Sequence, residues 1–116
     1  MERIERLCPV MNQNKIFALR KIKYQETTMI NICDIELLDK EINKGDFIIQ
    51  ISKNYFLEEE IDEREAITML KSSSVLNLVG NRIVKLALEL RLAKENSIKV
   101  IDNIPFLMIF RFVGNY

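Results

Sequence analysis

Hydrophobic residues in the first half of the chain follow the short spacing that is typical of β-strands. Residues 15–23 and 27–33, both rich in residues that favour strands, predict two strands joined by a hairpin turn at 24–26. Asp34 then predicts the cap of a short helical turn. A turn signal around Gly45 leads into a third predicted strand at 47–52. Three strands are therefore expected before the first long helix.

The middle of the chain changes to helical spacing. Asp62 followed three residues later by Glu65 is a capping box, which predicts a helix that begins there and runs to about Lys71. A triple serine then interrupts the pattern, and apolar residues over 76–90 return at helical spacing on either side of Gly80. We expect a short helix, a break and a longer helix in this region.

The last segment predicts two more strands. Residues 98–101 lead to Asp102 and Asn103, which suit a two-residue hairpin turn, and an apolar run extends from there to residue 112. Because residues 106–110 do not alternate, this strand is expected to be central and covered on both faces, with Phe106, Phe110 and Phe112 in the core.

These elements predict an α+β fold in which a single domain spans residues 14–116. Its mainly antiparallel sheet has about five strands, with two or three helices packed on one face. Residues 1–13 show no sustained period and are expected to form an N-terminal extension outside the core.

Composition places the chain among ordinary globular proteins. It has 116 residues, of which 48% are hydrophobic and 29% are charged, and its formal net charge is zero. The charged beginning has no apolar core, so it does not resemble a secretory signal, and the longest apolar run is too short to cross a bilayer. We expect a cytoplasmic protein with no membrane partner.

The residue types that support most enzyme chemistry are scarce. There is no histidine, there are three glycines, and Cys8 and Cys33 have no metal-binding spacing, so we expect no catalytic residues, metal, cofactor or small-molecule substrate. Cys33 is expected in the core. The acidic stretch 58–65 is consistent with a divalent-cation site, although a solvated loop leading into the first turn of a helix explains it better.

Charge is neutral overall but unevenly spread. Residues 1–24 contain six basic and two acidic residues, residues 25–70 four and twelve, and residues 71–116 seven and three. If the first strand lies beside the last helix and hairpin, their Lys and Arg residues would form one face suited to RNA phosphates. The candidate RNA-binding residues are Arg3, Arg6, Lys15, Arg20, Lys21, Lys23, Tyr24, Arg82, Lys85 and Arg111. Ordinary solvated positions would explain the same pattern.

Asn77 and Asn81 around Gly80 similarly indicate either a helix start that binds an anion or a capped helix break.

Three segments resemble an archaeal family known as domain of unknown function 424. They are residues 34–40 (Asp-Ile-Glu-Leu-Leu-Asp-Lys), residues 77–80 (Asn-Leu-Val-Gly) and the Ile104-Pro105 step, and the resemblance runs from about Lys15 to Phe112. The Asn-Leu-Val-Gly step leading into residues 84–87 is its most specific element. The chain departs from the family at residues 57–58, where the family has Gly-Gly, and at Phe106, where it has histidine.

The resemblance implies an archaeal cytoplasmic α+β protein without a recognised activity, associated with translation genes. We therefore expect a non-catalytic RNA-binding protein of the small ribosomal subunit, with rRNA and subunit proteins as partners. The alternative is a protein-interaction module that docks a basic partner through the acidic stretch 58–65 or an exposed edge strand.

Overall fold

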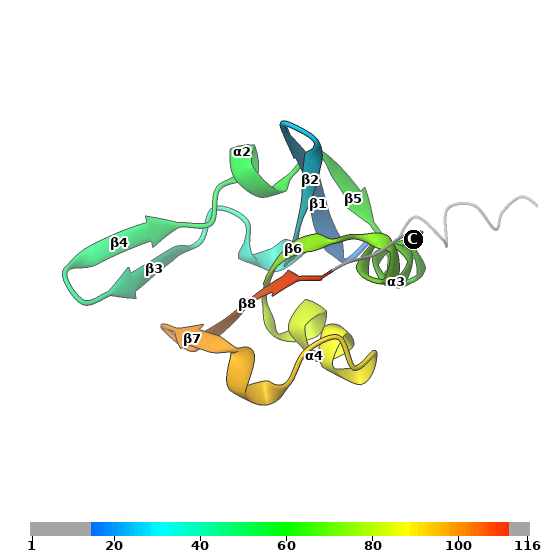
Figure 1. Ribbon diagram of the computed structural model, residues 1–116. Helices are drawn as coiled ribbons and strands as arrows, with labels where there is room; N and C mark the ends of the chain where they lie inside the picture. Colours follow the sequence, from blue (N-terminus) through cyan, green and yellow to red (C-terminus); the bar gives the residue numbers. More distant parts are fainter. Residues whose placement is uncertain (1–14, 112–116) are drawn as a thin grey trace, which may run out of the picture.

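The first two strands form the hairpin that the sequence predicts. In the computed structural model, which describes residues 15–111, β1 (Phe17–Tyr24) and β2 (Thr27–Asp34) pair antiparallel along their whole length (Figure 1). Phe17 lies opposite Asp34, and Tyr24 lies opposite Thr27. The expected extension at residues 1–13, with Arg3 and Arg6, lies outside the described residues.

The hairpin belongs to a sheet of six strands in the order β5-β1-β2-β6-β8-β7. The other four strands are β5 (Glu59–Ile61), β6 (Val75–Val79), β7 (Lys99–Ile101) and β8 (Ile104–Phe110). Pairing is antiparallel except between β2 and β6. The predicted single α+β domain with a mainly antiparallel sheet is confirmed, with six strands in the sheet where about five were expected.

Two helices cover one face of this sheet, as predicted. They are α3 (Glu63–Ser72) and α4 (Asn81–Glu89), and their apolar residues pack with those of β1, β2, β6 and β8 in the main core (Figure 1). The capping box of α3 is present, because Asp62 and Glu65 each accept a hydrogen bond from the other's backbone N–H. A four-residue helix, α2 (Lys53–Phe56), lies on the opposite face, against β1 and β2. Two 3-10 turns, η1 (Ile35–Leu37) and η2 (Glu95–Ser97), complete the helical elements.

A separate hairpin projects from the body of the domain. It consists of β3 (Glu41–Lys44) and β4 (Phe47–Gln50), which pair with each other and not with the main sheet. Figure 1 shows this β3–β4 arm extending away from the sheet and its helices. At its base, Ile42 and Ile51 are buried in a second, smaller core with Ala18, Cys33 and other residues. The strand predicted at 47–52 therefore exists, but outside the main sheet.

Three sequence predictions about β6 and β8 are wrong. Residues 75–79 form strand β6, although the sequence predicted helix over this segment. Five residues are too few to distinguish helical from strand spacing, and pairing with β2 and β8 makes this segment a strand. The last long strand, β8, is not central: β2 and β6 are, and β8 is second from the edge. Phe110 is not in the core, since 69% of its surface is exposed, and Phe112 lies outside the described residues.

Candidate binding surface on the open face of the sheet

The face of the sheet opposite α3 and α4 is only partly covered. Because side chains alternate along a strand, the strand register shows which residues share this face. At one end a row of three buried side chains, Ala18, Cys33 and Val79, lies in the second core, and the partly buried Phe106 continues this row and packs against it. Beyond this row, cover is less complete.

Two further rows cross the same face. The first contains Arg20, Asn31, Asn77 and Met108, which lie opposite one another on β1, β2, β6 and β8. The second contains Ile22, Met29, Val75 and Phe110 on the same four strands. We call these eight residues the open face. It combines one cation and two amides with one aromatic ring, two thioethers and two branched aliphatic side chains.

The first row contains a polar pair, Arg20 and Asn31, and a hydrogen bond to the backbone holds the Asn31 side chain in place. Asn31 is fully buried, and its Nδ2 donates a hydrogen bond to the Tyr55 carbonyl oxygen at 3.1 Å. Within the described residues, the buried Asn31 Oδ1 and Arg20 Nε have no hydrogen-bond partner. These two atoms are an acceptor and a donor on directly opposed residues. This row therefore holds one donor and one acceptor that are not used inside the described part of the protein.

The far side of the open face is accessible to solvent. Phe110 is 69% exposed and Met108 is 51% exposed, while Ile22, Met29, Val75 and Asn77 are half-buried. Large apolar side chains gathered beside amides and an arginine are typical of a binding surface rather than of ordinary solvent-facing sheet. The sequence did not reveal that Phe110 and Met108 are exposed, because the apolar run in β8 does not show which of its faces is covered.

The predicted basic run of β1 is divided between the two faces of the sheet. Arg20 is on the open face, whereas Lys21 and Lys23 alternate to the side of α3 and α4. Tyr24 is the last residue of β1. The three cations therefore cannot act as one cluster, and the sequence predicted their proximity along the chain but not their directions.

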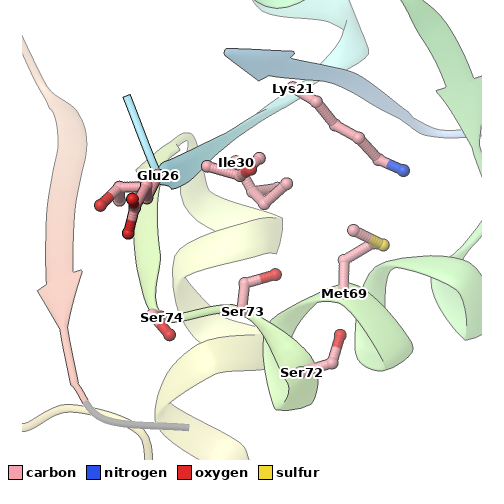
Figure 2. Close-up of a pocket in the computed structure, with 9 residues that line it drawn as sticks. Lys21, Glu26, Ile30, Met69, Ser72, Ser73 and Ser74 are labelled. Atoms are coloured by element: carbon pink, nitrogen blue, oxygen red, sulfur yellow. The ribbon is translucent and has the colours of Figure 1, made fainter. Parts of the chain in front are cut away.

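Lys21 borders a cavity of about 480 Å³ on the helix side of the sheet. Figure 2 shows its side chain beside Met69 of α3, with Ile30 of β2 and the serines that follow α3 around the same space. The lining residues are Lys21, Glu26, Thr27, Thr28, Ile30, Met69, Ser72, Ser73 and Ser74. The Ser72 hydroxyl is already committed, since it donates a hydrogen bond to the Thr68 carbonyl oxygen. The lining holds mostly hydroxyl groups and no pair of carboxylates.

Three other candidate cations are held by groups of the same chain. Lys15 Nζ lies 3.0 Å from Glu65 Oε1, and Arg82 lies 2.8 Å from Glu36 Oε2. Arg111 donates from its guanidinium to the carbonyl oxygens of Ser73 and Leu70, which caps the end of α3. Lys85 is exposed and lines a shallow hollow beside Arg82. Arg111 therefore has a structural role that the sequence did not reveal.

The two basic ends of the chain do not meet in the sheet. β2 and β6 separate β1 from β8, so the condition on which a single basic face depended is not met. Lys85 and Arg82 are on α4, close to the start of β1, while Lys21 and Lys23 are near its end. The structure therefore distributes the predicted cations over several surfaces.

The start of α4 is occupied by an internal carboxylate. Asp34 Oδ2 and Oδ1 accept hydrogen bonds from the backbone N–H groups of Arg82 and Ile83 at 2.9 and 3.0 Å. Burial raises the pKa of Asp34, and these two hydrogen bonds oppose that rise. Gly80 makes the approach possible, because a Cβ at this position would lie 2.5 Å from Asp34 Cγ. Asp34 therefore caps α4 and not the 3-10 turn η1 that follows it, and it fills the place of the anion that Asn77 and Asn81 suggested.

The remaining candidate groups are accounted for within the described part of the chain. Cys33 is fully buried as predicted, and burial raises the pKa of its thiol to about 12. Glu59 and Glu60 of the acidic stretch are in edge strand β5, and Asp62 and Glu65 cap α3. Residues 15–111 contain no group of three or more side chains placed to hold a metal ion. Their helices are all too short or too polar to span a membrane.

Comparison with known proteins gives a family and one structural neighbour. A search of curated proteins finds no match. The fold is similar to the crystal structure of an uncharacterized conserved protein from Methanopyrus kandleri, with a TM-score of 0.71 and 16% sequence identity over 86% of this chain and 95% of that chain. The family model described as "Protein of unknown function (DUF424)" matches residues 22–112. The chain therefore belongs to the DUF424 family, as its sequence motifs indicated.

Proposed function

We propose that this protein is a non-catalytic RNA-binding protein of the archaeal cytoplasm, associated with the small ribosomal subunit as a constituent or an accessory factor. In this proposal, single-stranded rRNA binds across the open face. The observation that carries it is the row of Arg20, Asn31 and Asn77 beside the exposed Met108 and Phe110.

This arrangement suits unpaired bases. Proteins recognise single-stranded RNA by stacking bases on aromatic side chains and by hydrogen bonds to base edges. Phe110 offers an exposed ring, the Asn77 amide can donate and accept, and Arg20 adds a guanidinium whose Nε has no hydrogen-bond partner within the described residues. A base-paired duplex keeps its bases stacked and would not fit a flat sheet face in this way. The open face should therefore prefer single strands.

Phosphate contacts have a smaller part in the mechanism than the sequence suggested. Lys21 and Lys23 are exposed near the end of β1 but on the side of α3 and α4, so they can contact the backbone only of an RNA strand that passes around the end of β1. Lys15, Arg82 and Arg111 are engaged with groups of the same chain. The ribosomal part of the proposal is supported by the association of the resembled family with translation genes.

A binding measurement with matched variants tests the use of the open face. Fluorescence anisotropy with labelled single-stranded rRNA fragments should show binding that weakens with salt, and duplexes of the same sequence should bind less. Phe110→Ala should weaken binding about 5-fold to 150-fold, the range expected for loss of one stacked base. Val100→Ala is the control, because Val100 is 62% exposed on β7 but alternates to the opposite face. Equal effects of the two variants would reject the open face as the RNA site.

A protein partner is the second candidate, favoured by the acidic edge of the sheet. β5 pairs on one side with β1, and within the described residues its other side is unpaired. Glu59 and Glu60 are exposed there, so the edge suits a basic strand from another protein. Capture from nuclease-treated extract separates the two candidates, since a protein partner should survive removal of RNA and an rRNA contact should not.

A further inference from the structure

The β3–β4 arm exposes an unusual amount of apolar surface for so small an element. Phe47, Ile48 and Ile49 are consecutive, and they are 71%, 67% and 40% exposed. All four residues of β4 are exposed, and none of them is charged. An isolated two-stranded hairpin is marginally stable in water, whereas a sheet of three or more strands is not. Natural edge strands are usually protected by lysine, proline or a covering segment, and β4 has none of these among the described residues.

The outer side of β4 is ready to pair with another strand. Lys44 and Phe47 flank a two-residue turn, so they form the hydrogen-bonded pair that closes the hairpin. Hydrogen-bonded and non-hydrogen-bonded pairs alternate along an antiparallel ladder. The backbone N–H and C=O groups of Ile48 and Gln50 therefore point away from β3. Two outward-facing residues separated by one are the minimum that a second antiparallel strand needs.

We infer that this edge pairs with the same edge of a second copy of the chain, around a two-fold axis that passes between the two Ile49 residues. In that register Ile48 pairs with Gln50 of the other copy, and each pair can form two backbone hydrogen bonds. The product is one four-stranded antiparallel sheet in the order β3-β4-β4-β3. This inference goes beyond the RNA-binding proposal and does not use the open face.

Side-chain alternation is what favours a second copy over an unrelated strand. Phe47 and Ile49 share a face of the arm with Ile42 and Ile51, which are buried in the second core. Pairing centred on Ile49 places Phe47 of one copy opposite Ile51 of the other, so the exposed ring would cover the other copy's second core. The same contact forms twice. Because β4 is uncharged, the pairing brings no like charges together.

The contact is small, which sets the strength expected of it. Three side chains and a short ladder bury less than the roughly 800 Å² per partner of a standard interface. We therefore expect reversible dimers with a dissociation constant in the range of roughly 10 to 100 μM. Local crowding of copies would raise the dimer fraction.

Site-specific disulfide formation tests the register directly. In a Cys8→Ser background, Ile49→Cys should form a covalent dimer under mild oxidation, since residues opposed in a non-hydrogen-bonded pair have Cα atoms about 4.5 Å apart. Glu41→Cys is the control, because Glu41 is also exposed but is on β3, away from the axis. Selective dimerisation of the Ile49→Cys variant supports the pairing. Equal crosslinking of both variants, or none, would overturn it.

Sedimentation velocity of the full chain over a concentration series provides the second readout. Ile48→Pro removes an outward-facing N–H without breaking the hairpin, and it should abolish the concentration dependence. Ile48→Thr retains that N–H and should therefore preserve most of the concentration dependence. A wild-type chain that stays monomeric up to millimolar concentration would contradict the inference.

Discussion

Gly80 is the residue at which a single methyl group should have the largest effect on stability. Its φ of +121° and ψ of 157° fall in a region that is open almost exclusively to glycine, where another residue costs about 2 kcal/mol. The added Cβ would also lie 2.5 Å from Asp34 Cγ and 2.9 Å from Asp34 Cβ. Displacing that carboxylate would remove the cap of α4, which is worth about 2 kcal/mol. Gly80→Ala should therefore destabilise the fold by about 4 kcal/mol.

Urea denaturation followed by circular dichroism measures this loss. With a slope of about 1.5 kcal/mol/M, the midpoint should fall by about 3 M relative to wild type. Asp34→Ala removes the carboxylate, which is the nearer part of the side chain that the methyl meets, and leaves only Cβ at 2.9 Å. In that background Gly80→Ala should therefore cost mainly the backbone strain of about 2 kcal/mol. Two results would refute this reasoning. One is a double variant whose loss of stability equals the sum of the two single losses within about 0.5 kcal/mol, and the other is a loss below about 1 kcal/mol for Gly80→Ala alone.

Three further predictions concern groups whose roles the structure defines. The Cys33 thiol, with its pKa raised to about 12 by burial, should not react with a thiol reagent at pH 8 in a Cys8→Ser variant until urea unfolds the chain; fast reaction in the native state would contradict its burial. The Glu65 backbone N–H lowers the pKa of Asp62 below 3.8, so Asp62 contributes stability above that value and loses it as the pH falls through the lower, folded-state pKa. Asp62→Ala should therefore reduce the difference in urea midpoint between pH 6 and pH 3. A difference as large as that of the wild type would disprove this role of Asp62. Arg111→Met should lower the urea midpoint by about 1 to 2 M, because the guanidinium donates to the two carbonyl oxygens of Leu70 and Ser73 at the end of α3. It should leave the RNA affinity of the folded protein unchanged, and weaker RNA binding at full folding would give Arg111 the contact role that the sequence suggested.

Local signals were sufficient for the elements that depend on neighbouring residues. The β1–β2 hairpin, the capping box at Asp62 and the turn at Asp102 and Asn103, both of which have positive φ, follow from residue types a few positions apart. Strand β6 was mistaken for a helix because Leu76, Val79 and Ile83 lie at helical spacing although a strand ends and a helix begins between them. Strand β5 gave no signal, since Glu59 and Glu60 are poor strand formers that pair only because β1 offers a free edge.

The candidate surface depended on long-range pairing and could not be read from the sequence. Arg20, Asn31, Asn77 and Met108 are brought into one row by the register of four strands. Asp34 reaches α4 across 48 residues of sequence, so its role as a cap had no local signature. Charge along the chain was informative about composition, but the alternation of β1 separated Arg20 from Lys21 and Lys23.

Gradient sedimentation of a native cell extract, with each fraction probed for this protein at low and high salt and after nuclease treatment, tests the central claim most directly. A protein bound to rRNA should migrate with the small ribosomal subunit at low salt and leave it at high salt or once the RNA is digested. Migration at the top of the gradient under all three conditions would show that the protein does not bind the small subunit.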